Sequence, residues 1–387
     1  MIPSLVCDPQ NVSQSMMNSV LPIRVLLVDD SVVIRGLIKR MIEPEAGIEV
    51  VDSVGNGELA VKRLESGGID IIILDIEMPV MDGLTALPKL LAIDPKIKII
   101  MASTLTLGNA EISIEAMKMG AADYLPKPTS TAKIGGASAF RDELIAKIKA
   151  LGQSRVKREI SDPRAPRLPT PSKSPSLLAR AAGEIKLRPS PARFPPEIVA
   201  IGSSTGGPKA LFEVLNGVTS AVKVPIVITQ HMPASFTTIL AKHITTSIGR
   251  ECAEGIDGET LMPGRIYLAP GDYHMTVESQ GIKKVIRLNQ EAPENYCRPS
   301  VDPMFRSIAA AYGGRVLSVV LTGMGSDGSR GAKVIAEAGG TVIAQDEETS
   351  VVWGMPGAAA ATGVCSEVLS LDKIATYINN FVVKGRA

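Results

Sequence analysis

The sequence predicts two α/β domains, each built on a parallel sheet, with a flexible linker between them. The chain has 387 residues, too many for one ordinary core and enough for two domains of about 100 to 200 residues each. Short apolar runs typical of buried strands alternate with helical patterns in both halves. Between the halves lies a stretch rich in Pro, Ser and Arg without an apolar period, which cannot bury enough surface to offset its chain entropy.

These changes of pattern set the boundaries that we expect. The expected parts are an N-terminal extension over 1–22, a first domain over 23–141, a basic linker over 142–194 and a second domain over 195–384. Residues 152–196 hold ten Lys or Arg against three acids, so the remaining chain carries about −6 although the total is +1. Folded domains of that sign are poor nucleic-acid binders, and we expect no nucleic-acid partner.

Cysteine usage and hydropathy indicate the compartment. The four cysteines are scattered and form no CxxC pair, which argues against a zinc site and a disulfide framework. No secretory signal precedes the first domain, and no apolar run approaches about 18 residues. We therefore expect a cytoplasmic protein that is not embedded in a membrane.

The first domain begins with a predicted strand, IRVLLVDD, followed by a helical pattern from Ser31 to Met41. Further predicted strands are IDIIILDI and KIKIIMAS, and the apolar stretch AADYLPKP comes later in the domain. Strands that alternate with helices predict βαβ units and hence a parallel sheet.

Chemistry-bearing side chains end several of these strands: Asp29, Asp30, Asp75, Ser103 and Lys127. The carboxyl ends of parallel strands meet at one edge of the sheet. Three carboxylates there repel one another unless a hard cation such as Mg²⁺ lies among them. A carboxylate beside Mg²⁺ can attack phosphorus, which makes Asp75 the candidate phosphoacceptor. Alternatively, Asp30 and Ser31 simply cap the helix that follows.

The motifs VDDS, DIEMPVMDG and MAST, and the KP dipeptide at Lys127, together resemble the response-regulator receiver family. The resemblance implies a doubly wound (βα)5 fold and phosphorylation of Asp75 by a chemotaxis histidine kinase. It implies Mg²⁺ ligands from Asp30, Asp75 and the backbone carbonyl of Glu77. It also implies phosphoryl-binding and switch residues, namely Ser103, Lys127 and Tyr124. A packing role for Tyr124 stays equally open.

The strand rhythm resumes in the second domain with EIVAIGSS, VPIVITQH, VLSVVLTGM and GGTVIAQD, which again predict a parallel α/β sheet. Between His243 and Pro299 the pattern is less regular. There GRIYLAPGDYHMTV and KKVIRLN are predicted to form inserted β-hairpin structure.

The turn after EIVAIG carries the candidate nucleophile. Gly202, Ser204 and Gly206 satisfy G-x-S-x-G between a strand and a helix that starts near Pro208. Such a turn either presents a nucleophilic hydroxyl or binds phosphate through its backbone N–H groups. The turn lacks the Lys of a phosphate loop and the G-x-G-x-x-G spacing, which favours the hydroxyl.

Two further strands deliver the partners of a serine nucleophile: His231 follows VPIVITQ and Asp327 follows VLSVVLTGMGS. If these strands are neighbours, His231 takes the proton of Ser204, Asp327 orients the imidazole and backbone amides hold the oxyanion. Asp327 could instead stabilise its own glycine-flanked turn. His243 and His274 are interpreted as structural, and Trp353 as a packing residue.

From Ile198 onward, IGSSTGGP, ITQHMP, RPSVDPMF, LTGMGSDG and VVWGMPGA resemble the catalytic domain of chemotaxis protein-glutamate methylesterases. The resemblance implies a parallel-sheet esterase that hydrolyses glutamate γ-methyl esters on the cytoplasmic domains of methylated chemoreceptors, and deamidates glutamine. It implies the triad Ser204, His231 and Asp327, with Met324 and Thr205 supporting the oxyanion and no cofactor for the esterase chemistry.

Two other functions fit parts of the pattern. A receiver joined to a silent nucleotide-binding domain would use the same glycine-rich turn without catalysis. A receiver joined to a DNA-binding output is disfavoured, because no helix-turn-helix pattern and no basic folded face are present.

Overall fold

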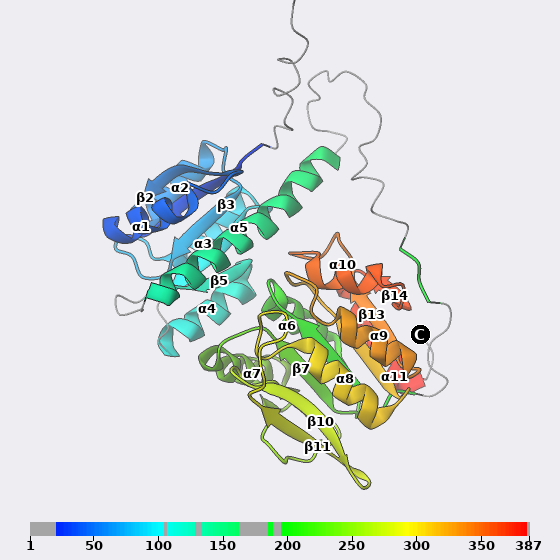
Figure 1. The fold of residues 1–387 in the computed structure, drawn as a ribbon. Coiled ribbons are helices and arrows are strands. Elements are labelled where there is room, and N and C mark those ends of the chain that lie inside the picture. Colours follow the sequence, from blue (N-terminus) through cyan, green and yellow to red (C-terminus); the bar gives the residue numbers. More distant parts are fainter. Residues whose placement is uncertain (1–20, 104–106, 128–133, 162–184, 189–194, 385–387) are drawn as a thin grey trace, which may run out of the picture.

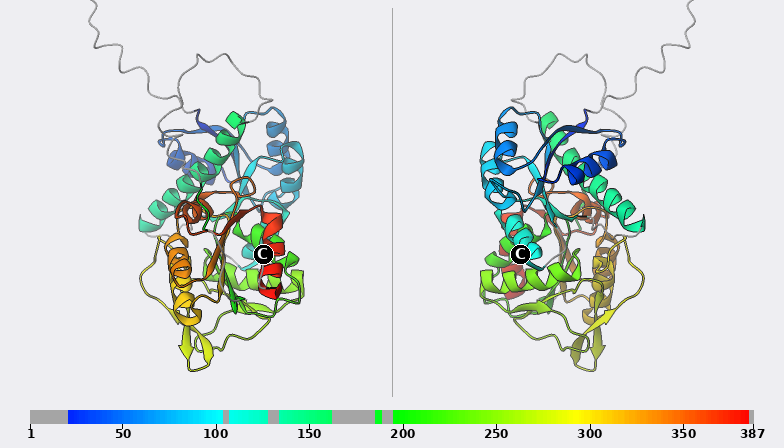
Figure 2. Two further views of the ribbon diagram at one scale, coloured as in Figure 1. Left: turned by 90° about the vertical axis from the view of Figure 1, so that its right-hand side faces the viewer. Right: turned by 90° about the vertical axis from the view of Figure 1, so that its left-hand side faces the viewer.

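The computed structural model describes residues 21–103, 107–127, 134–161, 185–188 and 195–384. Each of the two predicted domains is a parallel sheet with helices on both faces (Figure 1). In Figure 2 the first domain lies against one end of the second. None of the helices within these ranges combines the length and the apolar character needed to span a bilayer.

The first domain has the expected doubly wound (βα)5 fold, with strand order β2-β1-β3-β4-β5. Its strands are β1 (Ile23–Val28), β2 (Ile48–Val54), β3 (Ile71–Asp75), β4 (Lys98–Ser103) and β5 (Asp123–Pro126). Its helices are α1 (Val32–Ile42), α2 (Gly57–Glu65), α3 (Gly83–Ile93), α4 (Leu107–Met119) and α5 (Ile134–Ser161). All five residues of β3 are buried, as expected for a strand covered by helices on both faces.

Short polar side chains start the helices. Ser31 accepts a hydrogen bond from the N–H of Ile34 at 3.4 Å and is the N-cap of α1. Asp29 in turn accepts from the N–H of Ser31 at 2.9 Å. Asp30 is exposed and is not the cap, so the capping interpretation holds for Ser31 but leaves Asp30 available to a ligand.

Helix α5 runs from Ile134 to Ser161 and crosses the boundary expected at residue 141. The expected linker over 142–194 is therefore helical at its start, because Leu144, Ile148 and Leu151 recur at helical spacing and are buried against the first sheet. Residues 162–184 and 189–194 of the linker, and residues 1–20 of the extension, lie outside the described part of the chain. The boundaries of the parts stay a prediction.

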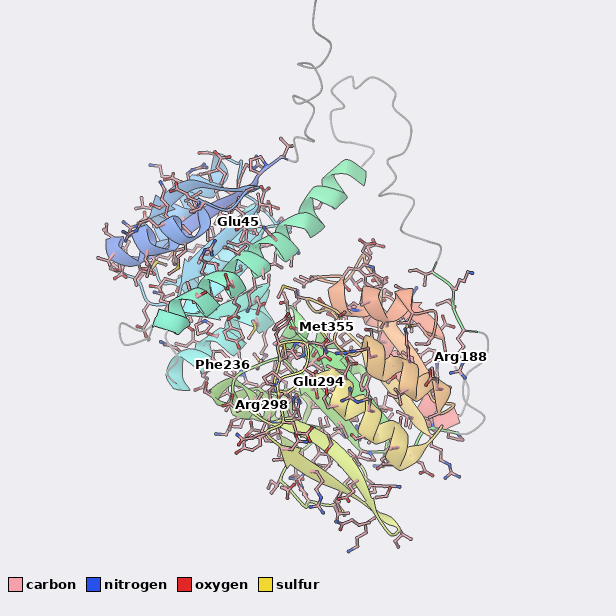
Figure 3. The ribbon with its side chains drawn as sticks, viewed as in Figure 1. Glu45, Arg188, Phe236, Glu294, Arg298 and Met355 are labelled. Carbon is pink, nitrogen blue, oxygen red and sulfur yellow. The ribbon has the colours of Figure 1, made fainter. Side chains whose placement is uncertain are left out.

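Arg188 fixes one short piece of the expected linker to the second domain (Figure 3). Its backbone N–H donates to the carbonyl of Cys365 at 2.8 Å. Its guanidinium donates to the carbonyls of Ala336 at 2.9 Å and Gly340 at 3.2 Å. This segment is thus attached to the second domain rather than free of it.

The second domain contains a seven-stranded parallel sheet with the order β14-β13-β12-β6-β7-β9-β8. Its strands are β6 (Ile198–Ser203), β7 (Ile226–Gln230), β8 (Cys252–Glu254), β9 (Ile266–Leu268), β12 (Val316–Val320), β13 (Thr341–Gln345) and β14 (Glu367–Leu369). Its helices are α6 (Gly207–Gly217), α7 (Ala234–Ile248), α8 (Val301–Tyr312), α9 (Ser329–Glu337), α10 (Gly354–Ala361) and α11 (Leu371–Lys384).

The region predicted to form inserted hairpin structure does so only in part. Strands β10 (His274–Gln280) and β11 (Lys283–Asn289) pair antiparallel over their whole length. The preceding IYL segment, β9, instead pairs parallel with β7 and β8. Its three residues are all buried, which explains why its apolar run belongs to the main sheet.

Strand register brings the ends of β6, β7 and β12 together. Gly202 of β6 lies beside Val320 of β12, and Ser203 lies beside Gln230 of β7. The loops that follow these three strands therefore meet at one edge, where an open α/β sheet normally holds its functional site.

Replacing Phe305 with Ala should destabilise the second domain. Phe305 lies on α8 and is fully buried, so the change leaves a cavity and should lower the free energy of unfolding by about 3–5 kcal/mol. The protein has one tryptophan, Trp353, so its fluorescence during chemical denaturation follows this domain. Ile282→Ala, at a side chain 99% exposed, should change the value by less than about 0.5 kcal/mol. Equal stability of the two variants would contradict the packing described here.

Candidate active site and phosphorylation site

Three aspartates meet at the carboxyl edge of the first sheet. Carboxylate oxygens of Asp29, Asp30 and Asp75 all lie within 4.8 Å of one another. Lys127 completes the cluster, with its Nζ 2.6 Å from Asp75 Oδ1 and 2.7 Å from Asp29 Oδ2. The predicted gathering of Asp29, Asp30, Asp75 and Lys127 is present.

The burial of this cluster favours a bound cation. Burial raises the pKa of Asp75, Lys127 lowers it and Asp29 raises it again, which leaves the pKa at about 6. Asp29 Oδ2 is buried and has Lys127 Nζ as its ion-pair partner. Three carboxylates that lie close together and repel one another fit a hard, oxygen-bound ion such as Mg²⁺.

A cavity of about 470 Å³ opens beside the aspartates and is lined by Asp30, Glu77 and Asp82 among others. Glu77 thus lies where its backbone could face a metal ion. Ser103 ends the neighbouring strand, and its carbonyl accepts the backbone N–H of Lys127 at 2.7 Å. The hydroxyl of Ser103 is buried and shares a 3.2 Å hydrogen bond with that of Ser113.

Tyr124 is buried at the contact between the two domains. Its ring stacks on Phe236 of α7, with centroids 4.1 Å apart and planes 19° apart. Figure 3 shows Phe236 on the side of the second domain that faces the first. Lys147 lies 5.0 Å from the centroid of the Tyr124 ring, and burial raises the pKa of the phenol. The packing role that the sequence left open is therefore present, and the role of Tyr124 as a switch residue stays a prediction.

The Ser204 turn is held by the loops on both sides of it. The backbone N–H of Ser204 donates to the carbonyl of Thr322 at 3.0 Å. The side chain of Gln230 donates to the carbonyl of Ser204 at 2.9 Å and accepts from the hydroxyl of Ser203 at 2.7 Å. Ser204 itself is half-buried between the fully buried Ser203 and the buried Thr205.

Glycine is required where the turn enters α6. Gly206 has a φ of +76°, and a Cβ there would lie 2.6 Å from Val351. A Cβ on Gly207 would lie 2.0 Å from Oε1 of Gln230. The carboxamide oxygen of Gln230 thus lies close beneath the turn, which disfavours the phosphate-binding alternative because phosphate is anionic.

His231 and Asp327 form the predicted pair. His231 Nε2 lies 2.7 Å from Asp327 Oδ2, and the two side chains are 11% and 1% exposed. Burial opposes the charged form of Asp327, but the hydrogen bond with His231 lowers its pKa well below the usual range. Ser204, the third residue of the predicted triad, follows the neighbouring strand, and within the described residues its Oγ makes no hydrogen bond with His231.

Asp327 has a complete set of donors at the start of α8. Its oxygens accept the backbone N–H groups of Val301 at 2.6 Å, Asp302 at 3.0 Å and Gly328 at 2.9 Å. Nδ2 of Asn295 donates at 2.7 Å. The N-terminus of a helix favours an anion at this position. Asp327 is therefore more than a local turn stabiliser.

The two residues predicted to support an oxyanion lie at the domain contact. Thr205 is buried, and its hydroxyl donates to Asp123 Oδ2 of the first domain at 2.7 Å. Met324 is partly buried against a cluster that includes apolar side chains of the first domain. The backbone N–H groups of Thr205 and Met324 donate to no other described residue, so both remain available.

The other histidines and the tryptophan have structural contacts. His274 is buried, and its Nδ1 accepts the backbone N–H of Ser300 at 3.2 Å. His243 lies 3.9 Å from Glu111 and 4.0 Å from Glu115 across the domain contact. Trp353 packs against the core of the second domain.

Sequence reasoning missed four residues of these sites: Asp123, Gln230, Asn295 and Cys297. Cys297 Sγ lies 3.3 Å from Nδ1 of His231. Gln230 directly precedes His231 and could have been noticed in the ITQH block. The other three act through contacts between distant segments, which no spacing in the sequence indicates.

Both domains are similar to known proteins. A family model described as CheB methylesterase matches residues 199–378, and one described as response regulator receiver domain matches residues 25–137. The protein-glutamate methylesterase/protein-glutamine glutaminase 1 of Paramagnetospirillum magneticum is 58% identical over 92% of this chain and 95% of its own. The corresponding protein of Azospirillum brasilense is 56% identical over 94% of each chain. The crystal structure of the Thermotoga maritima CheB methylesterase catalytic domain is 39% identical, covering 49% of this chain and 100% of its own, with a TM-score of 0.48.

Mg²⁺ should bind the full chain more weakly as the pH falls through about 6. The reason is that a proton on Asp75, whose pKa is raised to about 6, competes with the cation. Isothermal titration at several pH values measures this change, and Asp75→Asn should remove most of the binding. Glu58→Gln, an exposed acid on α2, is the matched control. If the Mg²⁺ affinity changed neither with pH nor in Asp75→Asn, the assignment of the cluster as a metal site would be contradicted.

Proposed function

The chain belongs to the protein-glutamate methylesterase/protein-glutamine glutaminase family, and we propose that Ser204, His231 and Asp327 carry out its hydrolysis. The protein hydrolyses glutamate methyl esters under the control of a phosphorylatable receiver, in the adaptation step of chemotaxis signalling. The observation that supports the triad most strongly is the buried His231–Asp327 pair beside the Ser204 turn.

In the proposed reaction, Nδ1 of His231 takes the proton of Ser204 as Oγ attacks the carbonyl carbon of the ester. His231 then returns this proton to the leaving oxygen, and methanol departs from an acyl-enzyme. A water molecule that gives its proton to His231 attacks the acyl group, and the glutamate is released as Ser204 Oγ departs and takes this proton from His231. The same route applied to glutamine releases ammonia. Asp327 stays ionised throughout and stabilises the imidazolium.

The backbone amides of Thr205 and Met324 are the proposed oxyanion donors. Each follows a strand end at the active-site edge, and neither N–H is used by another described residue. Donors that are fixed before the reaction stabilise developing charge without reorganisation. The proposed esterase chemistry needs no cofactor.

Regulation is proposed to act through the domain contact next to Ser204. The receiver contributes Asp123, which binds the hydroxyl of Thr205, and Tyr124, which stacks on Phe236. Both receiver residues lie on β5, and Lys127, which contacts Asp75, follows that strand. We propose that phosphorylation of Asp75 withdraws Lys127 from its present partners, alters β5 and weakens the contact. A bound Mg²⁺, held by Asp30, Asp75 and the carbonyl of Glu77, would offset negative charge during phosphoryl transfer.

The proposed partners follow from the family. We propose the cytoplasmic domains of methylated chemoreceptors as the substrate and a chemotaxis histidine kinase as the phosphodonor, with the reaction in the cytoplasm. Ser103 and Lys127 are the proposed phosphoryl contacts, and Tyr124 is the proposed switch aromatic.

Ser204→Ala should reduce methanol release from methylated receptor membranes by at least about 10³-fold, because the nucleophile is lost. The full chain is assayed with a small phosphodonor and Mg²⁺. Ser203→Ala, at the fully buried neighbour, is the matched control and should retain measurable activity. If Ser204→Ala released methanol as fast as the wild type, the triad assignment would fail.

Tyr124→Ala should raise the activity of the unphosphorylated full chain by about two- to tenfold. The loss of one aromatic stack weakens the domain contact by about 0.5–1.5 kcal/mol. The control is Leu59→Ala, which changes an exposed receiver residue on α2.

A fragment from Pro195 onward, which lacks the receiver, should be more active than the unphosphorylated full chain. Equal rates for the fragment and the unphosphorylated full chain would contradict the proposal that the receiver restrains the esterase through the domain contact.

A further inference from the structure

The catalytic imidazole has a second side-chain partner besides Asp327. Nε2 of His231 is bonded to Asp327, which leaves Nδ1 as the nitrogen that can take a proton from Ser204. Nδ1 lies 3.3 Å from the thiol of Cys297, within the range of a sulfur hydrogen bond. The base nitrogen is thus occupied by a residue outside the proposed triad.

We propose that Cys297 is a positioning residue of the esterase: its thiol holds Nδ1 of His231 in the resting site and must release it to Ser204 at each turnover. This inference rests on the proposed function of His231. It assigns Cys297 a role that acts through His231 rather than on the substrate.

The chain fixes Cys297 independently of its thiol. The backbone N–H of Cys297 donates to the carbonyl of Glu294 at 2.9 Å. Asn295 and Tyr296 before it have positive φ values of 51° and 63°, a conformation that costs energy for residues other than glycine. The guanidinium of Arg298, the next residue, donates to the carbonyls of Gln290 and Glu291, each at 3.0 Å. Figure 3 labels Glu294 and Arg298 on either side of this segment.

Asn295 connects this loop to the triad. Its Nδ2 donates to Asp327 at 2.7 Å and to the buried Asp302 at 3.1 Å, and its Oδ1 accepts from Arg330 at 3.0 Å. The loop that carries Cys297 is therefore tied to the carboxylate that orients His231. The thiol of Cys297 and the carboxylate of Asp327 therefore bond the two different nitrogens of the His231 ring.

The proton between Cys297 Sγ and His231 Nδ1 can lie on either atom. In both cases Nδ1 cannot accept the proton of Ser204. If the thiol donates, it occupies the lone pair of Nδ1, and if the thiolate accepts, Nδ1 already carries a proton. The polar groups around the ring are Asp327 on the Nε2 side and Cys297 on the Nδ1 side, with Asp302, Arg330 and the Glu294–Arg306 pair farther out.

Burial disfavours the charged imidazole, but its bonds to Asp327 and Cys297 raise the pKa of His231 to about 10. Loss of the bond to Cys297 should therefore lower the pKa of His231. Cys252 and Cys365 do not share this role: both are buried, and burial raises the pKa of each thiol to about 12.

The first test follows the His231 imidazole of the full chain by NMR with ¹³C-labelled histidine. The chain has three histidines, so His231→Ala assigns the signal. In Cys297→Ser and Cys297→Ala the titration midpoint should move to lower pH by about 1–3 units, because the sulfur that bonds Nδ1 of His231 is removed. An unchanged midpoint in both variants would overturn the proposal. The buried His274 reports whether each variant keeps its native fold.

The second test measures the pH dependence of kcat/KM with methylated receptor membranes and phosphodonor. The acid limb of the Cys297→Ser profile should shift to lower pH by a similar amount. Glu291→Gln, an exposed acid of the same loop, should keep the wild-type profile. A Cys297→Ser profile that overlays the wild type would contradict the proposal. A wild type without esterase activity would instead overturn the proposed function. The NMR midpoint would still test the Cys297–His231 pair, so the two failures can be told apart.

Discussion

The buried carboxylate of Asp327 is the constraint on which the proposed catalytic site depends. An anion that is 1% exposed is costly unless donors surround it, and this one has three backbone N–H groups, an asparagine and His231. These donors come from the segment before α8, the start of α8, the turn after β12 and the end of β7. Satisfying one charge therefore fixes the relative positions of four segments that are far apart in the sequence, and the imidazole with them.

The parallel sheet explains how much of this could be predicted. Ser204, His231 and Asp327 each follow a strand whose apolar run is evident in the sequence, and adjacent parallel strands bring such residues to one edge. The same reasoning gathered Asp30, Asp75 and Lys127 in the receiver. Strand ends are predictable because they depend on local hydropathy and on a topology with few alternatives.

What could not be predicted depends on irregular backbone and on contacts between domains. Cys297 reaches His231 from a loop whose two preceding residues have positive φ, and no local pattern predicts that course. Asp123 and Thr205 are 82 positions apart and meet only because the domains pack together. The IYL segment of β9 joined the main sheet because its burial on both faces outweighed its position beside the hairpin.

The chemistry of the domain contact suits a reversible switch. Asp123 is buried there, but its counterion Lys147, at 3.1 Å, comes from the receiver itself. When the domains part, Asp123 loses only the hydroxyl of Thr205 and keeps its charge partner, so opening leaves no unpaired buried charge. The Tyr124–Phe236 stack contributes only about 0.5–1.5 kcal/mol beyond its buried area. A shift from about 1% to 99% open needs a differential of about 5.5 kcal/mol. We expect phosphorylation of Asp75 to supply part of this differential through β5, because the hydrogen bond of the Thr205 hydroxyl to the Asp123 carboxylate and the Tyr124–Phe236 stack both depend on that strand.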